Sequence, residues 1–251
     1  MAQKKTVLAV VLAVIIGIAI GGAAVWQFAK PPEAPKPPVA PEITRFSIAS
    51  GGIGGVYFYY CSSVASIISS AVPGVEATSM ATAASVANCW LIRDKGPSFM
   101  ALIMADVGFD AVKGLGKDFE GKPVPLSTLW MTYINHWHLV TRADAGITKI
   151  EDLKGKRVST GAPASGTEFK SLRILELYGI DNRSFSKWER LGADASAAAL
   201  KDIKIDAYCW DGGLPTGSVL DLANTLKMLQ GTSIVLLSVD DAHLNMLKAK
   251  Y

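Results

Sequence analysis

Short loops of glycine, serine and alanine contain the residues of this sequence best suited to bind a small anion. One loop covers residues 50–55 and another residues 161–166, and each lies between a predicted strand and a predicted helix. At such a helix N-terminus, free backbone N–H groups and the positive end of the helix dipole attract a carboxylate. Residues 211–215 form a third loop of this kind. The alternative for each loop is an ordinary strand-to-helix turn of an α/β protein.

The loop at residues 161–166 has the clearest local signals. Ser165 and Glu168 have the spacing of a capping box, which predicts a helix that begins at about Gly166 and ends at Gly179. No bulky side chain shields the backbone of this loop. It therefore has the features of an anion-binding turn.

Glycines dominate the first loop without matching a nucleotide-binding motif. Gly52 and Gly54 begin a dinucleotide fingerprint, but Tyr57 stands where the third glycine is required. No lysine follows as in a phosphate-binding loop. We interpret these glycines as space for a ligand.

Residues suited to catalysis or metal binding are few. His136 and His138 would face the same side of a strand, as two metal ligands do. No acid or cysteine nearby completes a coordination set, and buried strand histidines bonded to the backbone are more common. Lys170 and Asp211 are the remaining candidates for an acid or base in a cleft. The sequence predicts no metal, no cofactor and no catalytic constellation.

Strands alternate with helices after residue 42, which predicts a parallel sheet in an α/β fold. The predicted strands cover residues 43–48, 75–80, 99–104, 156–160, 187–191, 205–210 and 233–238. The other predicted helices cover residues 56–71, 85–93, 106–113 and 195–202, together with one that starts at Asp240 or Asp241. In this reading Asp106 and Asp194 are helix caps.

Two segments have the pattern of strands that cross between sheets. Residues 126–142 have strand composition throughout and no helix between their halves, which predicts a hinge, and residues 233–238 resemble a second crossing. We expect two lobes, residues 42–137 and residues 138–232, with residues 233–251 returning to the first. Arg142 ends the first crossing strand, where it either reaches a ligand carboxylate or, more commonly, pairs with a neighbouring acid.

The N-terminal residues predict attachment to a membrane. An uncharged apolar run at residues 6–28 is long enough to cross a bilayer, and two lysines before it place residues 1–5 in the cytoplasm. The length of the run favours an uncleaved anchor over a cleaved signal peptide. The proline-rich residues 29–41 predict an extended spacer. The folded part is therefore expected in the periplasm or on the extracellular face.

Charge and cysteine content exclude some functions. The net charge of +3 is small and scattered, which gives no reason to expect nucleic acid as a partner. Cys61, Cys89 and Cys209 have apolar neighbours, so we expect buried core thiols rather than redox or metal sites.

Several motifs resemble the TAXI family, the receptor proteins of one branch of the TRAP (tripartite, ATP-independent periplasmic) transporters. The resemblance covers residues 48–247 and is densest in GGIGGVY (51–57), ADVGFD (105–110), HLVTRAD (138–144), DLKGKRV (152–158), GAPASGTE (161–168) and IDA (205–207). It implies a two-lobed periplasmic-binding-protein fold of the second type with a hinge. It also implies a cleft that closes on a small organic acid or amino acid, glutamate being the best-attested kind, and passes it to a membrane permease without chemistry.

The loops and the resemblance together define the candidate ligand-binding residues. Those on the first lobe are Ser50, Gly51, Gly52, Gly54, Gly55, Tyr57, Ser85 and Asn88. Those on the second are Ser165, Gly166, Thr167, Trp210 and Asp211, where Trp210 would form a wall of the cleft.

The sequence departs from the family pattern in three places. Met104 and Ala105 replace a polar pair, which predicts a less polar pocket. Asp211 replaces a neutral residue and would suit a ligand ammonium group or repel a second carboxylate. The sequence ends at Tyr251, where relatives continue, so we expect a C-terminally shortened fold.

Two other functions use the same features. A membrane-tethered regulatory domain that senses a ligand would share every pocket residue. An enzyme on this fold would need Lys170 or Asp211 as its acid or base.

Overall fold

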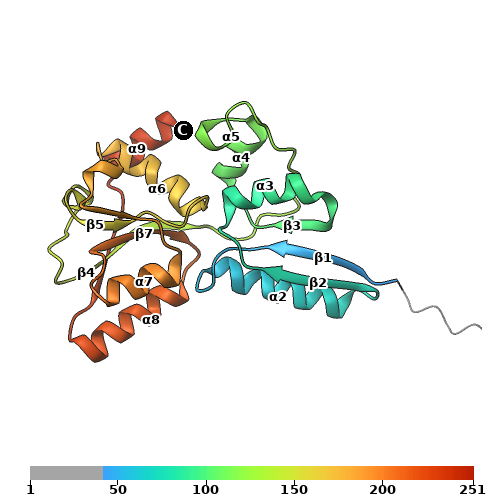
Figure 1. Cartoon of the computed structure of the whole chain (residues 1–251), viewed down its shortest axis with the longest axis horizontal. Coiled ribbons are helices and arrows are strands. Elements are labelled where there is room, and N and C mark those ends of the chain that lie inside the picture. Colours follow the sequence, from blue (N-terminus) through green and yellow to red (C-terminus); the bar gives the residue numbers. More distant parts are fainter. Residues whose placement is uncertain (1–41) are drawn as a thin grey trace, which may run out of the picture. The chain divides into compact units, whose positions relative to one another are not determined.

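Three parallel strands in the order β2-β1-β3 form the first of two sheets in the computed structural model, which describes residues 42–251 (Figure 1). The strands are β1 (Thr44–Ala49), β2 (Val75–Met80) and β3 (Phe99–Ala101). The helices are α2 (Val56–Ala71), α3 (Ser85–Lys95), α4 (Ala105–Lys113) and α5 (Gly116–Phe119), with a 3-10 turn at Gly96–Ser98. We call these elements the first lobe.

Two apolar clusters hold the first lobe together. Ile48 on β1 and Ala77 on β2 pack against Cys61 and Ala65 of α2. A second cluster joins α3, α4 and α5, and Phe169 of the following lobe belongs to it. Apolar packing therefore continues from one lobe into the other.

The second lobe is built on five strands in the order β6-β5-β7-β4-β8. The strands are β4 (His136–Arg142), β5 (Arg157–Ser159), β6 (Lys187–Glu189), β7 (Ala207–Gly212) and β8 (Ile234–Leu237). Strand β5 is parallel to β6 and β7, whereas β4 is antiparallel to β7 and β8. The predicted α/β fold with two parallel-rich sheets is confirmed.

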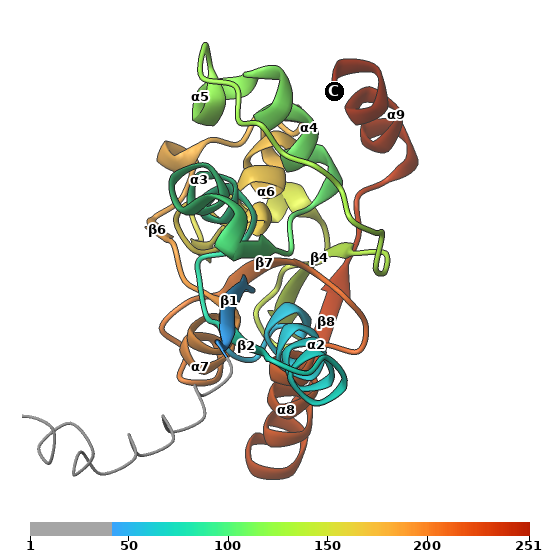
Figure 2. The ribbon, with the colours of Figure 1, turned by 90° about the vertical axis from the view of Figure 1, so that its right-hand side faces the viewer.

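Helices cover both faces of this five-stranded sheet (Figures 1 and 2). Helices α6 (Gly166–Leu177) and α9 (Asp241–Lys250) lie on one face, and α7 (Ala193–Lys201) and α8 (Gly217–Thr225) lie on the other. Short 3-10 turns at Ile150–Leu153 and Asn182–Ser184 and a π turn at Leu226–Gln230 complete the lobe. Leu139, Leu153, Ile174 and Leu175 are central to the core beneath α6.

The prediction of a strand throughout residues 126–142 is wrong for its first half. Only His136–Arg142 forms a strand, and residues 122–135 connect α5 to β4 without regular structure. Trp130 donates a hydrogen bond to the hydroxyl of Tyr60 at 3.2 Å, while Leu129 and Met131 are exposed. Strand composition was not sufficient, because residues 126–135 have no neighbouring strand with which to pair.

The prediction that residues 233–251 return to the first lobe is also wrong. Strand β8 pairs antiparallel with β4, with Leu237 opposite Leu139, so it extends the second-lobe sheet. Helix α9 then packs on α6, where Lys250 and Tyr251 both bond to Glu176. The apolar side chains of β8 and Leu247 are thereby placed against the second-lobe core.

Local sequence signals correctly predicted most of the other helices and strands. Helix α2 and strand β2 have the predicted bounds. Strand β3 is shorter than predicted, and α4 begins at Ala105 with Met104 as its N-cap, so the prediction that Asp106 caps this helix is wrong. The Asp106 carboxylate instead accepts from the N–H of Val107 at 3.0 Å.

All three cysteines are free and buried, which confirms the prediction of core thiols. The apolar run at residues 6–28 and the spacer at residues 29–41 lie outside the described residues. Within residues 42–251, none of the helices has both the length and the apolar character that a membrane crossing requires.

Candidate functional site

A partly enclosed pocket lies where loops of the two lobes face each other. Its first-lobe lining is Gly51, Gly52, Gly55, Val56, Tyr57, Thr82, Ala83, Ala84 and Met104. Its second-lobe lining is Ala162, Ser165, Gly166, Thr167, Gly192, Ala193, Trp210, Asp211 and Gly212. The three predicted loops therefore meet at one site.

Four helix N-termini open onto this pocket. Helices α2, α3 and α7 begin after Gly55, Ala84 and Gly192, and none of these three N-termini is capped by a side chain. Helix α6 begins after Ser165, whose hydroxyl accepts from the N–H of Glu168 at 3.0 Å. Uncapped N–H groups and aligned helix dipoles make the pocket attractive to an anion.

The backbone is strained where α3 meets the pocket. Ala84 has φ +84° and ψ −146°, a conformation that L residues with a Cβ atom rarely adopt. Its N–H donates to the hydroxyl of Thr82 at 3.0 Å. This hydrogen bond helps to hold the strained turn that exposes the start of α3.

The glycine loop of the first lobe contacts the second lobe directly. Gly54 has φ +85°, and a Cβ atom there would overlap the carboxylate of Asp194 in the first turn of α7. A Cβ atom at Gly55 would lie 3.3 Å from the ring of Trp210. Gly54 is not among the lining residues, so its place is at the contact between the lobes rather than in the pocket.

A second glycine serves the same contact from the opposite side. A Cβ atom at Gly166 would overlap the sulfur of Met104 and lie 2.7 Å from the hydroxyl of Ser85. Beside it, the N–H of Ala87 in α3 donates to the carbonyl of Ala164 at 3.1 Å. We call the close approaches at Gly54, Gly55 and Gly166 the glycine contact.

Three predicted site residues lie behind the pocket and support its loops. Asn88 donates to the carbonyls of Ser50 and Leu102 at 2.7 and 2.8 Å, which joins the ends of β1 and β3. The hydroxyl of Ser50 donates to the carbonyl of Met80 at 2.8 Å. The hydroxyl of Ser85 accepts from the N–H of Met104 at 3.1 Å. The side chains of Ser50, Ser85 and Asn88 are buried and bonded to protein groups.

Trp210 and Asp211 form the wall contributed by β7. The Trp210 indole donates to the hydroxyl of Thr216 at 3.0 Å, which fixes the ring against Gly55. Asp211 is only 2% exposed. Burial raises the pKa of its carboxyl group, and the nearby Lys170 ammonium opposes that change.

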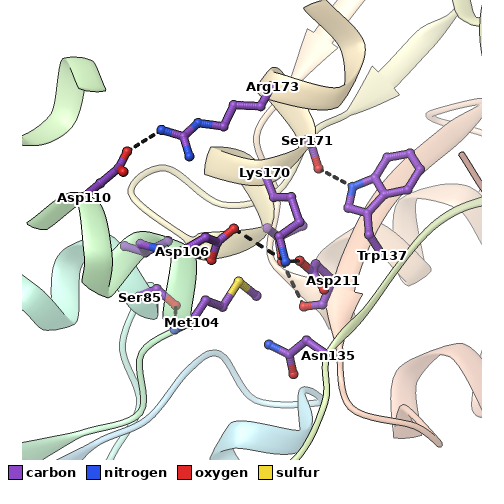
Figure 3. A network of polar contacts seen from close by, with 12 residues as sticks. Ser85, Met104, Asp106, Asp110, Asn135, Trp137, Lys170, Ser171, Arg173 and Asp211 are labelled. Carbon is purple, nitrogen blue, oxygen red and sulfur yellow. Dashed lines mark hydrogen bonds and ion pairs between the residues drawn. The ribbon is translucent and has the colours of Figure 1, made fainter. Parts of the chain in front are cut away.

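An ionic contact joins α4 of the first lobe to α6 of the second (Figure 3). The Lys170 Nζ lies 2.6 Å from Asp211 Oδ2 and 3.6 Å from Asp106 Oδ2. One helical turn away, Arg173 pairs with Asp110. Burial disfavours charge on Lys170, but the Asp211 and Asp106 carboxylates outweigh it and raise the pKa of the lysine.

Sequence reasoning missed several lining residues. Gly192 and Ala193 follow β6, and the rule that small residues after a strand line a site would have found them. Thr82, Ala83 and Ala84 follow β2 in the same way. Asn135 gave no sequence signal, but its amide donates to the Tyr57 hydroxyl at 3.2 Å.

The histidines and the arginine singled out in the sequence lie away from the pocket lining. The ring of His138 is buried beside the carbonyl of His136, and burial lowers the pKa of His138. Arg142 pairs with Asp144 at 2.8 Å and bonds to Gln230. Among residues 42–251 no three acidic, histidine or cysteine side chains are grouped as metal ligands.

The fold and the site together define a class of protein. Two α/β lobes with a pocket between the carboxyl ends of their strands form the two-lobed periplasmic-binding-protein fold of the second type. The model of the NMT1-like family matches residues 48–251, and the chain belongs to this family.

Solved structures of binding proteins resemble the chain at low identity. The alkanesulfonate-binding protein SsuA from Xanthomonas axonopodis pv. citri, bound to MOPS, is 16% identical with a TM-score of 0.48 over 80% of this chain and 63% of that one. The aliphatic sulphonate binding protein SsuA from Escherichia coli is 17% identical. Its TM-score is 0.44, over 82% of this chain and 59% of the SsuA chain.

A third similar structure is an ABC uptake transporter substrate binding protein from Streptococcus pneumoniae with bound histidine. It is 13% identical, with a TM-score of 0.48 over 82% of this chain and 83% of that chain. The chain thus spans 63% and 59% of the lengths of the two SsuA proteins.

Proposed function

We propose that the protein is an extracytoplasmic solute-binding receptor that holds a small organic acid or amino acid between its lobes and delivers it to a membrane permease. The observation that carries this proposal is the pocket itself. It receives helix N-termini from both lobes, and three of the four have no side-chain cap. A ligand carboxylate would satisfy N–H groups of both lobes at once and so favour their closed arrangement.

The side chains of the pocket support binding rather than chemistry. Of the described residues that line it, Tyr57 and Asp211 are the only ionisable ones. Burial raises the pKa of Tyr57 to about 12, so at neutral pH its hydroxyl is protonated and serves as a hydrogen-bond donor. Lys170 is held between two carboxylates and does not line the pocket. A receptor without enzymatic activity is the function that these residues fit.

Our proposals for the transport partner and for the location of the protein rest on the sequence. The motifs that resemble the TAXI family favour a TRAP permease and a ligand of the glutamate kind, whereas one of the solved structures named above is a protein of an ABC uptake transporter. The apolar run at residues 6–28 favours attachment to the membrane. The folded lobes would then lie in the periplasm or on the extracellular face.

Binding is tested on the full chain, purified in a mild detergent, by thermal shift and calorimetry against organic acids and amino acids. A ligand at a hundred times its dissociation constant should add about 2.7 kcal/mol to the free energy of unfolding. Trp210→Leu should weaken binding at least tenfold, because it removes a pocket wall. Trp188→Leu is the matched control, since Trp188 also donates to a threonine hydroxyl but does not line the pocket. A cooperative melt that no acid or amino acid shifts would contradict the proposal.

Delivery is tested by uptake of the identified ligand in cells with and without the gene. Uptake should fall when the gene is deleted and should depend on an ion gradient. Uptake that depends on ATP would indicate an ABC transporter as the partner instead of a TRAP permease. Unchanged uptake would favour a sensing domain that uses the same pocket.

A further inference from the structure

The polar groups around Asp211 contain more negative than positive charge. Among residues 42–251, Lys170 is the one cation in contact with both Asp211 and Asp106, so the three side chains sum to −1 (two carboxylates and one ammonium). Asp106 is partly exposed, with 35% of its side chain accessible, and water can screen its charge. The Asp211 side chain is fully buried, and Asp211 is among the residues that line the pocket.

Lys170 is the ionic partner of Asp211, but it leaves part of the hydrogen-bonding capacity of this carboxylate free. Lys170 Nζ approaches Oδ2 at 2.6 Å as an ion pair, but neither carboxylate oxygen has a well-directed hydrogen bond to a protein group. Buried polar atoms are almost always hydrogen-bonded, so such an exception calls for a partner. The N–H groups of an ammonium ion are suitable partners for both oxygens.

A second unpaired acceptor lies beside Asp211. The amide Nδ2 of Asn135 donates to the Tyr57 hydroxyl, while its buried Oδ1 has no partner. Figure 3 shows the side chain of Asn135 below Asp211 and Lys170. Hydrogen-bond acceptors are thus concentrated near Asp211, in contrast to the donors at the helix N-termini.

We propose that Asp211, assisted by Asn135, binds the ammonium group of the ligand while the helix N-termini bind its carboxylate. The ligand is then an amino acid zwitterion with an uncharged side chain. This inference rests on the proposed receptor function and narrows its ligand class. A dicarboxylate would bring a second negative charge to a pocket whose lining, within residues 42–251, contains no lysine, arginine or histidine. A zwitterion instead places one charge of each sign where the pocket has the opposite one.

The test compares ligands that differ only at the amino group. The full chain is titrated by calorimetry at pH 7 with the uncharged L-amino acids, with L-glutamate, and with the 2-hydroxy acid that corresponds to the tightest-binding amino acid. The amino acid should bind at least a hundredfold more tightly than its hydroxy analogue, because a hydroxyl group brings no positive charge to Asp211. It should also bind more tightly than L-glutamate.

Two substitutions separate the ammonium site from a general effect of charge. Asp211→Asn should weaken amino acid binding at least a hundredfold and leave hydroxy acid binding unchanged or stronger. Asp106→Asn removes the same charge from the same lysine but does not line the pocket, so it should change amino acid affinity less than fivefold. If Asp211→Asn does not melt cooperatively, the comparison of amino and hydroxy acids on the unaltered chain decides alone.

The two proposals fail differently. Hydroxy acids or dicarboxylates that bind as tightly as amino acids would overturn the ammonium site and leave the receptor function standing. The absence of binding by any acid or amino acid to a cooperatively folded chain would overturn both.

Discussion

The glycine contact and the ionic contact join the same two lobes by different physical means. At Gly54 and Gly166 the glycine backbone approaches side chains of the opposite lobe so closely that a single added carbon would overlap them. At the ionic contact, Lys170 and Arg173 reach the other lobe through long flexible side chains. Steric contact falls off within a fraction of an ångström, whereas charge attraction acts over several. The ionic contact is therefore suited to guide closure, and the glycine contact to fix its end point.

The difference also bears on the candidate site. The glycine contact contains the helix N-termini that would hold a ligand carboxylate, while the ionic contact contains Asp211 at its inner side. At both the glycine contact and the ionic contact, the atoms that join the lobes therefore lie next to atoms that would bind the ligand. Substitutions at the two contacts should differ in size and in kind.

The largest effect is expected from Gly54→Val. A β-branched residue at φ +85° is strained by at least 1–2 kcal/mol, and its side chain overlaps Asp194. Ligand affinity, measured by calorimetry, should fall at least a hundredfold. The control is Gly155→Val, which has φ +76° and no heavy atom within 4 Å of its added carbon. It should lower stability but leave affinity within threefold, and equal losses of affinity in the two variants would show that backbone strain alone is responsible.

Gly166→Ala should have the next largest effect. Its φ angle is not strained, so the cost comes from overlap with Met104 and Ser85 and should be about 1–3 kcal/mol. Affinity should fall about tenfold. The double variant Gly166→Ala with Met104→Ala should recover most of the loss, because it removes the overlapping sulfur. No recovery would mean that Ser85 or the α6 backbone sets the limit.

The pH dependence of stability should reveal the buried member of the ionic contact. The pKa of Asp211 is raised in the folded protein, chiefly by burial, so its contribution to stability is fully present below the carboxyl pKa of the unfolded chain and is lost as pH rises through the raised pKa. The free energy of unfolding of the ligand-free protein, relative to Asp211→Asn, should therefore decrease from pH 4 to pH 7. Urea unfolding at several pH values measures this difference.

Asp206 provides a control of opposite sign. Its hydrogen bond to Arg157 lowers the pKa of this carboxyl group, so its contribution is present at neutral pH and is lost as pH falls through the lowered pKa. Stability relative to Asp206→Asn should increase with pH. A difference that does not vary with pH for Asp211→Asn would contradict a buried, poorly compensated carboxylate.

The smallest effect is expected where Arg173 meets Asp110. Both side chains are largely buried, so a double-mutant cycle with Arg173→Met and Asp110→Asn should give a coupling of about 1 kcal/mol in unfolding. Ligand affinity should change less than threefold, since flexible side chains can find other partners. The exposed pair of Arg45 and Glu76, which lies within one lobe, should give less than 0.5 kcal/mol. A tenfold loss of ligand affinity in Arg173→Met would contradict the expectation that the ionic contact affects ligand binding less than the glycine contact does.

The sequence predicted the parts of the fold that local chemistry determines. The glycines before α2 and the Pro73-Gly74 turn after it mark the bounds of this helix, and the capping serine marks the start of α6. Residues 126–135 and β8 were predicted incorrectly because strand composition does not say which strand is the neighbour. Pairing is decided by contacts between distant segments, which no local pattern contains.

The candidate site, too, was predicted only where local chemistry determines it. The small-residue loops were visible in the sequence, and most of their predicted residues line the pocket. The sequence did not show that Gly54 contacts Asp194, or that Ser50 and Asn88 are occupied by backbone groups. It also gave no reason to place Lys170 within 2.6 Å of Asp211. Such relations depend on how the two lobes meet, so they require coordinates.

The three buried cysteines make the described lobes suitable for optical reporters. Burial raises the pKa of the Cys61, Cys89 and Cys209 thiols to about 12, so at neutral pH they are protonated as well as inaccessible. Maleimide dyes react with exposed thiolates, and the native thiols would compete little with a cysteine introduced at the surface. Exposed positions such as Lys113 and Lys204, one on each lobe, could then carry a donor and an acceptor dye. Energy transfer between them would follow the opening and closing of the lobes in single molecules.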